Sequence, residues 1–330
     1  MKRKSKSPKT DGVKKVENVD SKNLPKKRHE PGTARCLILD GMNLAYQAYY
    51  AYHNLSHKGK STSILFGMSQ IISGLIKMHR PVKLIICWDG YRSKRRLKKL
   101  PGYKSHREEG RDKEKHGKFL KEIKTCRKLF SYMGIPQAHN EKLEGDDMIY
   151  WVNKKMQLIY PTLIVSADKD FKQLINYDVS LYHPRSKEVS GVFAFSASNA
   201  GIAVSQYRDY MILQGDKSDD IPGYPGIGPV RAGKLLKDFG SISNYLKSKE
   251  DFPGLTDKEG LKKLYKRNRF LMDLPYYNEK YHTDKDITYF RGKSSPAFND
   301  AKYRRICLKY NLKTMLSDTF TKTFKNIING

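Results

Sequence analysis

The sequence has no long apolar run and few acidic residues for its length. No stretch of about 20 apolar residues occurs, and the N-terminus lacks the apolar core of a secretory signal, so neither a membrane-spanning helix nor export is expected. Asp and Glu number 34 against 64 Lys and Arg, a formal net charge of +30. This excess indicates a polyanionic partner, with nucleic acid the first candidate and an anionic membrane surface the second. We expect a soluble, intracellular protein.

Cysteine is also scarce, and neither cysteine nor histidine has the spacing of a metal site. The four cysteines are scattered without a C-x-x-C pair, and the nine histidines include no H-E-x-x-H motif. These patterns disfavour both a disulfide framework and a zinc site. We expect reduced thiols, with Cys36 and Cys87 as small core residues inside apolar runs.

The first 34 residues differ in composition from the rest of the chain. From Met1 to Thr33 the sequence is rich in Lys, Ser and Pro and has almost no large apolar residues, so burial cannot offset the entropy of ordering it. We therefore expect a disordered basic tail over residues 1–34. It adds non-specific phosphate affinity, acts as a targeting signal, or is simply solvated.

Three short apolar runs, over residues 35–40, 82–88 and 162–166, each end in an acid or lead to one, and helical spacing runs from Ile64 to Met78. These acids are Asp40, Asp89 and Asp168. Strands that alternate with helix-length segments predict an α/β fold with a mostly parallel central sheet flanked by helices. One such acid is often only a helix N-cap. Three at the carboxyl ends of parallel strands indicate a site.

More acids occur at other predicted junctions. They are Glu144, Asp146 and Asp147 at a helix start, Asp170 beside Asp168, and Asp216 and Asp219 after a helix ending near Leu213. Two carboxylates about 4 Å apart repel by roughly 1 kcal/mol in water and about 4 at an effective dielectric of 20, so a convergent cluster needs cations. Lys or Arg could serve, but a pair of divalent ions such as Mg²⁺ explains the oxygen-only ligand set better.

A dense set of cations lies between Tyr91 and Lys128, with almost no hydrophobic core material. It includes Arg92, Lys94, Arg95, Arg96, Lys98, Lys99, Lys104, Arg107, Arg111, Lys113, Lys115 and Lys118. A run of this kind is usually a solvated face. Because this one leaves directly from Asp89 at a predicted strand end, we expect it to bind nucleic-acid phosphates near the acids.

The pattern of residues 225–236, with glycines at Gly226, Gly228 and Gly233, predicts a helix-hairpin-helix. The glycines permit a tight turn, and the amides at the start of the second helix can hold a phosphate. An ordinary glycine turn between helices is the alternative.

Five acidic motifs stand in the order typical of one nuclease family. They are Asp40-Gly41-x-Asn43, Asp89-Gly90, Glu144-Gly145-Asp146-Asp147, Ser166-Ala167-Asp168-Lys169-Asp170 and Gly215-Asp216-x-x-Asp219. Over residues 36–240 the chain resembles the flap endonuclease and 5′-nuclease family, closest to bacteriophage 5′-to-3′ exonucleases (ribonuclease H-like phage flap nucleases). The resemblance implies a PIN-like catalytic domain over residues 35–205, with a basic helical arch at about 91–128, and a helix-hairpin-helix and C-terminal helical region over residues 206–330.

The resemblance also assigns roles to the acids and to two cations. The first Mg²⁺ takes mainly Asp40, Asp89, Glu144, Asp146 and Asp168; the second takes Asp170, Asp216 and Asp219, with Asp147 between or just outside them. Mn²⁺ is a possible substitute. Asn43 would orient ligands or water, and Asp220 stands where some relatives carry Asn. Lys104 and Arg107 match a Tyr-Lys-x-x-Arg segment, so they are implied to act on the scissile phosphate together with Asp40, Asp146 and Asp168.

The implied nucleic-acid contacts come from the arch and the hairpin, and K⁺ could bind at the hairpin carbonyls. These contacts are Arg92, Lys94, Arg95, Arg96, Lys98, Lys99, Tyr103, Gly226, Gly228, Arg231, Lys234 and Lys237. Tyr103 is as well suited to packing as to stacking on a base.

The implied activity is that of a 5′-to-3′ exonuclease and flap endonuclease. It would hydrolyse phosphodiesters near single-strand/duplex junctions in replication or repair, leaving a 5′-phosphate and a 3′-hydroxyl without a covalent intermediate. We expect a monomer acting on branched or 5′-ended DNA, or on RNA–DNA hybrid, alone or beside separate replication proteins; if the source is viral, it would act in the cytoplasm of the host cell. The alternatives are a PIN-like single-strand ribonuclease and a non-catalytic junction-binding protein.

Overall fold

The computed structural model describes residues 36–107, 112–198, 201–283 and 297–328, so the predicted disordered tail lies outside the described residues. The strands are β1 (Cys36–Asp40), β2 (Ser56–His57), β3 (Lys60–Ser61), β4 (Lys83–Trp88), β5 (Gln137–His139), β6 (Thr162–Val165), β7 (Val179–His183), β8 (Glu188–Ser190), β9 (Gly215–Asp216) and β10 (Ile221–Pro222). The longer helices are α1 (Gly41–Ala51), α2 (Ser63–His79), α3 (Lys94–Lys99), α4 (Lys113–Tyr132), α5 (Gly145–Met156), α6 (Val192–Ser198), α7 (Tyr207–Gln214), α8 (Pro229–Phe239), α9 (Ile242–Lys247), α10 (Lys258–Met272), α11 (Leu274–Tyr281), α12 (Asp300–Lys309) and α13 (Asp318–Ile328). Short 3-10 turns are η1 (Ser105–Arg107), η2 (Lys169–Leu174), η3 (Val204–Gln206), η4 (Lys217–Asp219) and η6 (Lys313–Leu316).

A six-stranded sheet forms the centre, in the order β5-β4-β1-β6-β7-β8. All neighbouring strands are parallel except β8, which pairs antiparallel with β7. This confirms the predicted α/β class with a mostly parallel sheet. The three predicted strands appear as β1, β4 and β6 and lie side by side, so their carboxyl ends meet at one edge.

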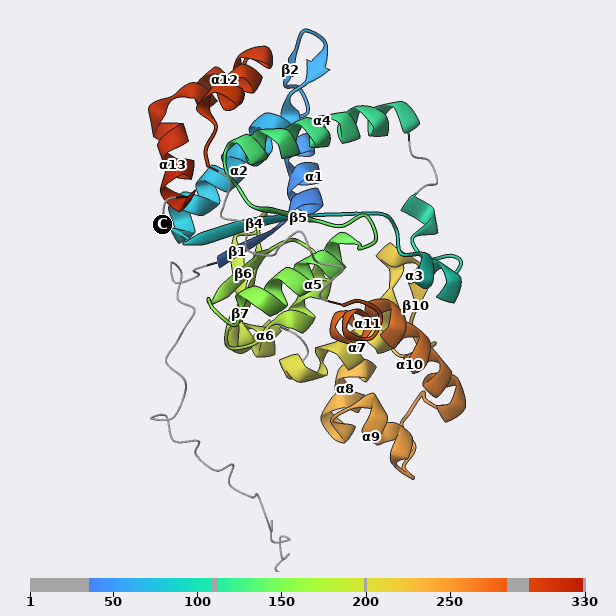
Figure 1. Cartoon of the computed structure of the whole chain (residues 1–330). Helices are drawn as coiled ribbons and strands as arrows, with labels where there is room; N and C mark the ends of the chain where they lie inside the picture. Colours follow the sequence, from blue (N-terminus) through green and yellow to red (C-terminus); the bar gives the residue numbers. More distant parts are fainter. Residues whose placement is uncertain (1–35, 108–111, 199–200, 284–296, 329–330) are drawn as a thin grey trace, which may run out of the picture.

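The strands are buried on both faces, and alternate residues enter two different cores. Along β1, Leu37 and Leu39 pack with α1, α2 and α4, whereas Cys36 and Ile38 pack on the opposite side. Figure 1 shows α1, α2, α4, α12 and α13 covering one face of the sheet, while α5 and the helices from α6 to α11 lie on the other. The site at the strand ends is therefore held between two packed layers.

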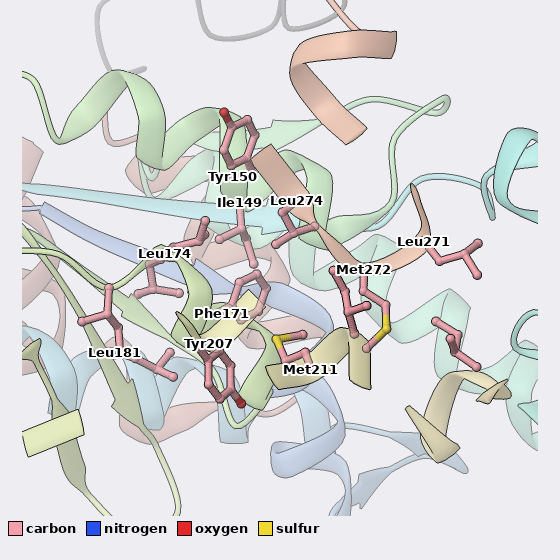
Figure 2. Close-up of a cluster of buried hydrophobic side chains, with 14 of the residues drawn as sticks. Ile149, Tyr150, Phe171, Leu174, Leu181, Tyr207, Met211, Leu271, Met272 and Leu274 are labelled. Atoms are coloured by element: carbon pink, nitrogen blue, oxygen red, sulfur yellow. The ribbon is translucent and has the colours of Figure 1, made fainter. Parts of the chain in front are cut away.

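The core on the α5 side joins the sheet to the later helices. Figure 2 shows Ile149 of α5 and Phe171 of η2 beside Tyr207 and Met211 of α7 and Leu274 of α11. This packing fixes the segments that follow β6 and α7, which carry further acids, against the strand ends.

All four cysteines are buried free thiols, which confirms the predicted core positions of Cys36 and Cys87. Among the described helices, none combines the length and apolar character needed to cross a bilayer.

One expectation differs from the structure. The segment from Tyr91 to Lys128 is not wholly surface, because α4 buries Phe119, Ile123 and Cys126 in the core against α1 and α2. The buried Glu122 carboxylate accepts hydrogen bonds from the amides of Ile64 and Leu65 at 2.7 and 3.1 Å, where α2 begins. The helical spacing of these residues was hidden by the many lysines between them.

Candidate active site

Ser166 connects the ends of β1 and β6 through hydrogen bonds. Asp40 ends β1 and caps α1, accepting a hydrogen bond from the Asn43 amide at 3.0 Å. The Ser166 hydroxyl, just after β6, donates to Asp40 Oδ2 at 2.8 Å and accepts from the Asp168 amide at 3.0 Å. The Asn43 side chain accepts from the Ala167 amide at 3.2 Å. These contacts bring Asp40 and Asp168 to one place, and no role was predicted for Ser166.

The start of α5 approaches the end of β4 closely. The Asp89 carboxylate accepts a hydrogen bond from the Gly145 amide, and a Cβ at Gly145 would collide with that carboxylate. Glycine at this position therefore lets the helix carrying Asp146 come up against Asp89.

Four acids form a first group, defined by their mutual repulsion: Asp40, Asp89, Asp146 and Asp168. Burial raises the pKa of Asp40 to about 7, and the charges of Asp89 and Asp168 add to the rise. Burial likewise raises the pKa of Asp146 well above its usual value; Lys104 opposes this, and Asp168, Asp89 and Asp40 reinforce it. Burial also raises the pKa of Asp89. The acids that end three strands and begin one helix thus share one site.

A second group of acids contains Asp170, Asp216 and Asp219. Asp168 interacts with both groups. Burial raises the pKa of Asp168, which is raised further by Asp219 and Asp216. Burial raises the pKa of Asp170 well above its usual value, and Asp168, Asp216 and Asp219 add to the rise. Asp168 therefore faces both groups, and Glu144, which the family resemblance placed with the first, pairs with Lys104.

Two cations of the basic segment reach these acids. The Lys104 ammonium lies 2.6 Å from Glu144 Oε2 and 3.5 Å from Asp219 Oδ2, and Arg107 pairs with Asp219. Although burial alone would lower it, the pKa of Lys104 is held well above its usual value by Glu144 and other neighbouring groups. Both side chains remain charged and stand among the carboxylates.

Glu144 is bonded to its surroundings on both oxygens. Oε1 accepts from the Ser93 amide at 2.8 Å, and Oε2 accepts from the Tyr103 hydroxyl at 2.9 Å and from Lys104. Against the effect of burial, Arg96 and Lys104 hold the pKa of Glu144 at about 2. Tyr103 is buried and packs here, so its side chain is not open to stack on a base.

Two predicted site residues, Arg96 and Asp147, pair with each other and are shielded from solvent. Asp147 is bound by the Arg96 guanidinium through two hydrogen bonds of 2.8 Å and accepts a third from Asn278 at 2.7 Å. Arg96 is only 2% exposed and lies against the Tyr277 ring, 3.9 Å from its centroid. Arg96 therefore cannot contact a phosphate backbone, and Asp147 is not placed to hold a metal ion. Together they join α3, α5 and α11.

This pair should matter for stability. We expect Asp147→Ala to lower the free energy of unfolding by about 3–5 kcal/mol, because the buried Arg96 loses its two hydrogen bonds to Asp147 and keeps only Glu144 Oε2, at 3.6 Å. Urea unfolding followed by circular dichroism measures the loss. Asp251→Ala, at a side chain that is 96% exposed, is the control. A loss for Asp147→Ala no larger than that of the control would show that the ion pair does not stabilise the fold.

The donor set suits a hard divalent cation. Every acidic ligand offers oxygen, and Asp170 Oδ1 is buried without a hydrogen-bond partner, an arrangement that a bound cation would satisfy. Among the described residues, no group of three or more His, Cys, Asp or Glu side chains is arranged to hold a metal ion as it stands. Lys104 and Arg107 instead balance part of the negative charge.

Other predicted nucleic-acid contacts lie on the surface. Lys94, Arg95, Lys98 and Lys99 of α3 are exposed, and Arg95 also donates to the Tyr281 carbonyl at 3.0 Å. Arg92 is half-buried at the entrance to this helix.

The glycine turn before α8 is exposed at Gly226 and Gly228 and anchored by the buried Ile227. Gly226 has a φ of 75°, which favours glycine, and Gly228 caps α8 with Pro229 next. Arg231 donates to the Gly226 carbonyl at 2.9 Å, while Lys234 and Lys237 are exposed along the helix. The turn follows the Asp216–Asp219 segment, which stands between α7 and α8.

Comparisons with known proteins show which family the chain matches. The N-terminal resolvase-like domain of 5′-3′ exonucleases matches residues 35–199, and their C-terminal SAM fold matches residues 202–291. A 5′-3′ exonuclease of Aquifex aeolicus is 32% identical over 247 residues, which cover 72% of this chain and 82% of that protein. DNA polymerase I of Mycobacterium bovis is 30% identical over 214 residues, which cover 62% of this chain. The match spans only 23% of the polymerase.

Among solved structures, the bacteriophage T5 flap endonuclease complex with DNA and metal ions has a TM-score of 0.65 and 22% identity, covering 89% of this chain and 99% of that chain. This likeness supports the fold. The family models and the Aquifex relative confirm the resemblance inferred from the acidic motifs. The chain belongs to the 5′-3′ exonuclease and flap endonuclease family of hydrolases.

Proposed function

We propose that this protein is a divalent-metal-dependent, structure-specific 5′ nuclease that cuts phosphodiesters near single-strand/duplex junctions in DNA during replication or repair. The observation that carries the proposal is the convergence of acids from the ends of β1, β4 and β6, with Lys104 and Arg107 placed among them. A junction-binding protein without catalysis would have no use for this concentration of buried negative charge.

We propose that the first acid group, with Glu144 beside it, holds one Mg²⁺ and that Asp170, Asp216 and Asp219 hold a second, with Mn²⁺ as a substitute. When bound, the ions supply an activated water and neutralise charge on the leaving oxygen. Lys104 and Arg107 donate hydrogen bonds to the scissile phosphate and stabilise the negative charge that grows on it. Cleavage of the phosphodiester leaves a 5′-phosphate and a 3′-hydroxyl.

We propose that the exposed cations of α3 bind the single-stranded 5′ end and that the glycine turn with Arg231, Lys234 and Lys237 grips the duplex, with K⁺ at its carbonyls. Helix N-terminal amides such as those of α8 suit a phosphate. In this proposal residues 35–205 carry most of the catalytic groups, Asp216 and Asp219 complete them, and the rest of residues 206–330 supplies the duplex contacts. The proposed enzyme acts as a monomer and also accepts RNA-primed DNA.

A cleavage assay tests the function. The protein is incubated with a labelled 5′-flap DNA, the matching flap with an RNA 5′ segment, and single-stranded RNA, each with Mg²⁺ or EDTA. We expect Mg²⁺-dependent cutting next to the junction and a 5′-phosphate on the product. Binding without cutting under any divalent metal would favour the junction-binding alternative. Cutting confined to single-stranded RNA would favour the ribonuclease.

Metal binding should also change the melting temperature of the protein. A raised pKa means that folded Asp40 keeps a proton that the unfolded chain has released, so stability falls as pH rises from about 4 to about 7. In EDTA the melting temperature should therefore drop across this window. Mg²⁺ at pH 7 should raise it again, since a ligand at about 100 times its Kd stabilises the folded form by about 2.7 kcal/mol. Differential scanning fluorimetry measures both effects, and no response to Mg²⁺ at pH 7 would contradict the metal site.

A further inference from the structure

Asp220, the acid that follows Asp219 of the second group, accepts hydrogen bonds from residues of the basic segment. Asp220 Oδ2 accepts from the Ser105 hydroxyl at 3.2 Å and from the His106 amide at 3.1 Å, and lies 2.7 Å from His106 Nδ1. A single carboxylate oxygen therefore meets two consecutive residues of the basic segment. Those residues stand between Lys104 and Arg107 in the sequence.

The backbone supports the same junction. The Lys104 amide donates to the Asp219 carbonyl at 3.0 Å. Lys104 and Asp220 both have left-handed backbone conformations, with φ of 58° and 57°. This conformation is unfavourable for Lys104 and persists where surrounding contacts impose it, whereas Asp220 adopts it at the end of η4, where aspartate tolerates it. Segment 104–107 and the loop 216–220 are thus shaped to fit each other.

We propose that Asp220 is a positioning residue that fastens segment 104–107 to the loop 216–220, so that Lys104 and Arg107 stay aligned over the acids. The inference rests on the proposed function. In this proposal Asp220 binds neither the scissile phosphate nor the metal ions, because its Oδ2 is committed to Ser105 and His106. It acts through the two cations whose backbone it holds.

Single-turnover cleavage of a 5′-flap DNA at saturating Mg²⁺ tests the role in catalysis. We expect Asp220→Ala to slow the step about 10- to 100-fold, because small misplacements of a catalytic group cost that much. Flap binding should change by no more than about twofold. Asp220→Asn keeps an acceptor oxygen and should recover most of the rate. The Mg²⁺ concentration for half-maximal rate should stay unchanged in both variants; a large shift would make Asp220 a metal ligand and overturn the proposal.

A double-mutant cycle separates positioning from general stabilisation. In an enzyme that already carries Lys104→Met and Arg107→Met, Asp220→Ala should cause little further loss, because the groups it positions are gone. The same fractional loss in this background as in the wild type would overturn the proposal.

A measurement without metal or substrate keeps the inference independent of the nuclease assay. Hydrogen exchange at the His106 amide should be faster in Asp220→Ala than in the wild type, with Asp220→Asn close to the wild type. The exchange of the Glu114 amide, which is held by Asp112 at 3.0 Å, serves as the internal control. If His106 exchange is unchanged, the contact does not hold the segment, whatever the enzyme cuts. If exchange responds but the wild type cuts nothing, it is the proposed function that fails.

Discussion

Asp168→Ala should lose strand cleavage almost completely, with a single-turnover rate at least about 10³-fold below that of the wild type, since the metal contribution amounts to several kcal/mol. Asp168 is the acid that faces both groups: it raises the pKa of Asp40 and of Asp170. Removing it should weaken both ion sites at once. Gel-based cleavage of a 5′-flap DNA with Mg²⁺ measures the loss.

The Asp168→Ala variant should still bind the flap DNA. Less negative charge near the phosphate path should leave flap affinity equal or slightly higher, as measured by fluorescence anisotropy in Ca²⁺. Asp251→Ala, an exposed acid outside the site, should cut at the wild-type rate. Cleavage by Asp168→Ala within about tenfold of the wild type would remove this residue from the catalytic centre.

Lys104→Met should lower the rate of the chemical step about 10²- to 10³-fold, the usual cost of removing one donor to a developing oxyanion. Methionine keeps the length of the buried side chain, so the loss reports the charge more than the packing. The substitution leaves the Glu144 carboxylate with Tyr103, Ser93 and Arg96 as partners. Single-turnover cleavage at saturating enzyme measures the step.

Lys98→Met is the matched control on the same basic segment. Lys98 is exposed on α3, so its loss should weaken flap binding and reduce its salt dependence while leaving the saturated rate unchanged. Equal rates for Lys104→Met and the wild type would mean that Lys104 only balances the charge of Glu144.

The sequence was sufficient for the parts of the fold that repeat a simple pattern. β1, β4 and β6 are continuous apolar runs followed by acids, so their type and the place of Asp40, Asp89 and Asp168 could be predicted. β5, β7 and β8 could not. They are not continuous apolar runs, since they contain polar residues such as Gln137 and Ser180, so they become strands through pairing with their neighbours.

The sequence predicted which acidic residues form the site, but not which residues each of them pairs with. Glu144, Asp146 and Asp147 are nearly consecutive, yet helix geometry turns Asp147 away toward Arg96 and Asn278. Nothing in the local sequence marks Arg96 as different from the exposed lysines beside it. Its partner is 51 residues away and the covering Tyr277 still farther. The junction of Asp220 with Ser105 and His106 likewise joins segments about 115 residues apart.

The central claim is that the buried acids meet in order to hold divalent cations. A crystal grown with Mn²⁺, with data collected at an energy where manganese scatters anomalously, locates any bound ion directly. We expect anomalous peaks among Asp40, Asp89, Asp146 and Asp168 and beside Asp170, Asp216 and Asp219, at about 2.1 Å from carboxylate oxygens. Carboxylates that stay paired with Lys104 and Arg107, with no manganese between them at saturating Mn²⁺, would contradict the claim.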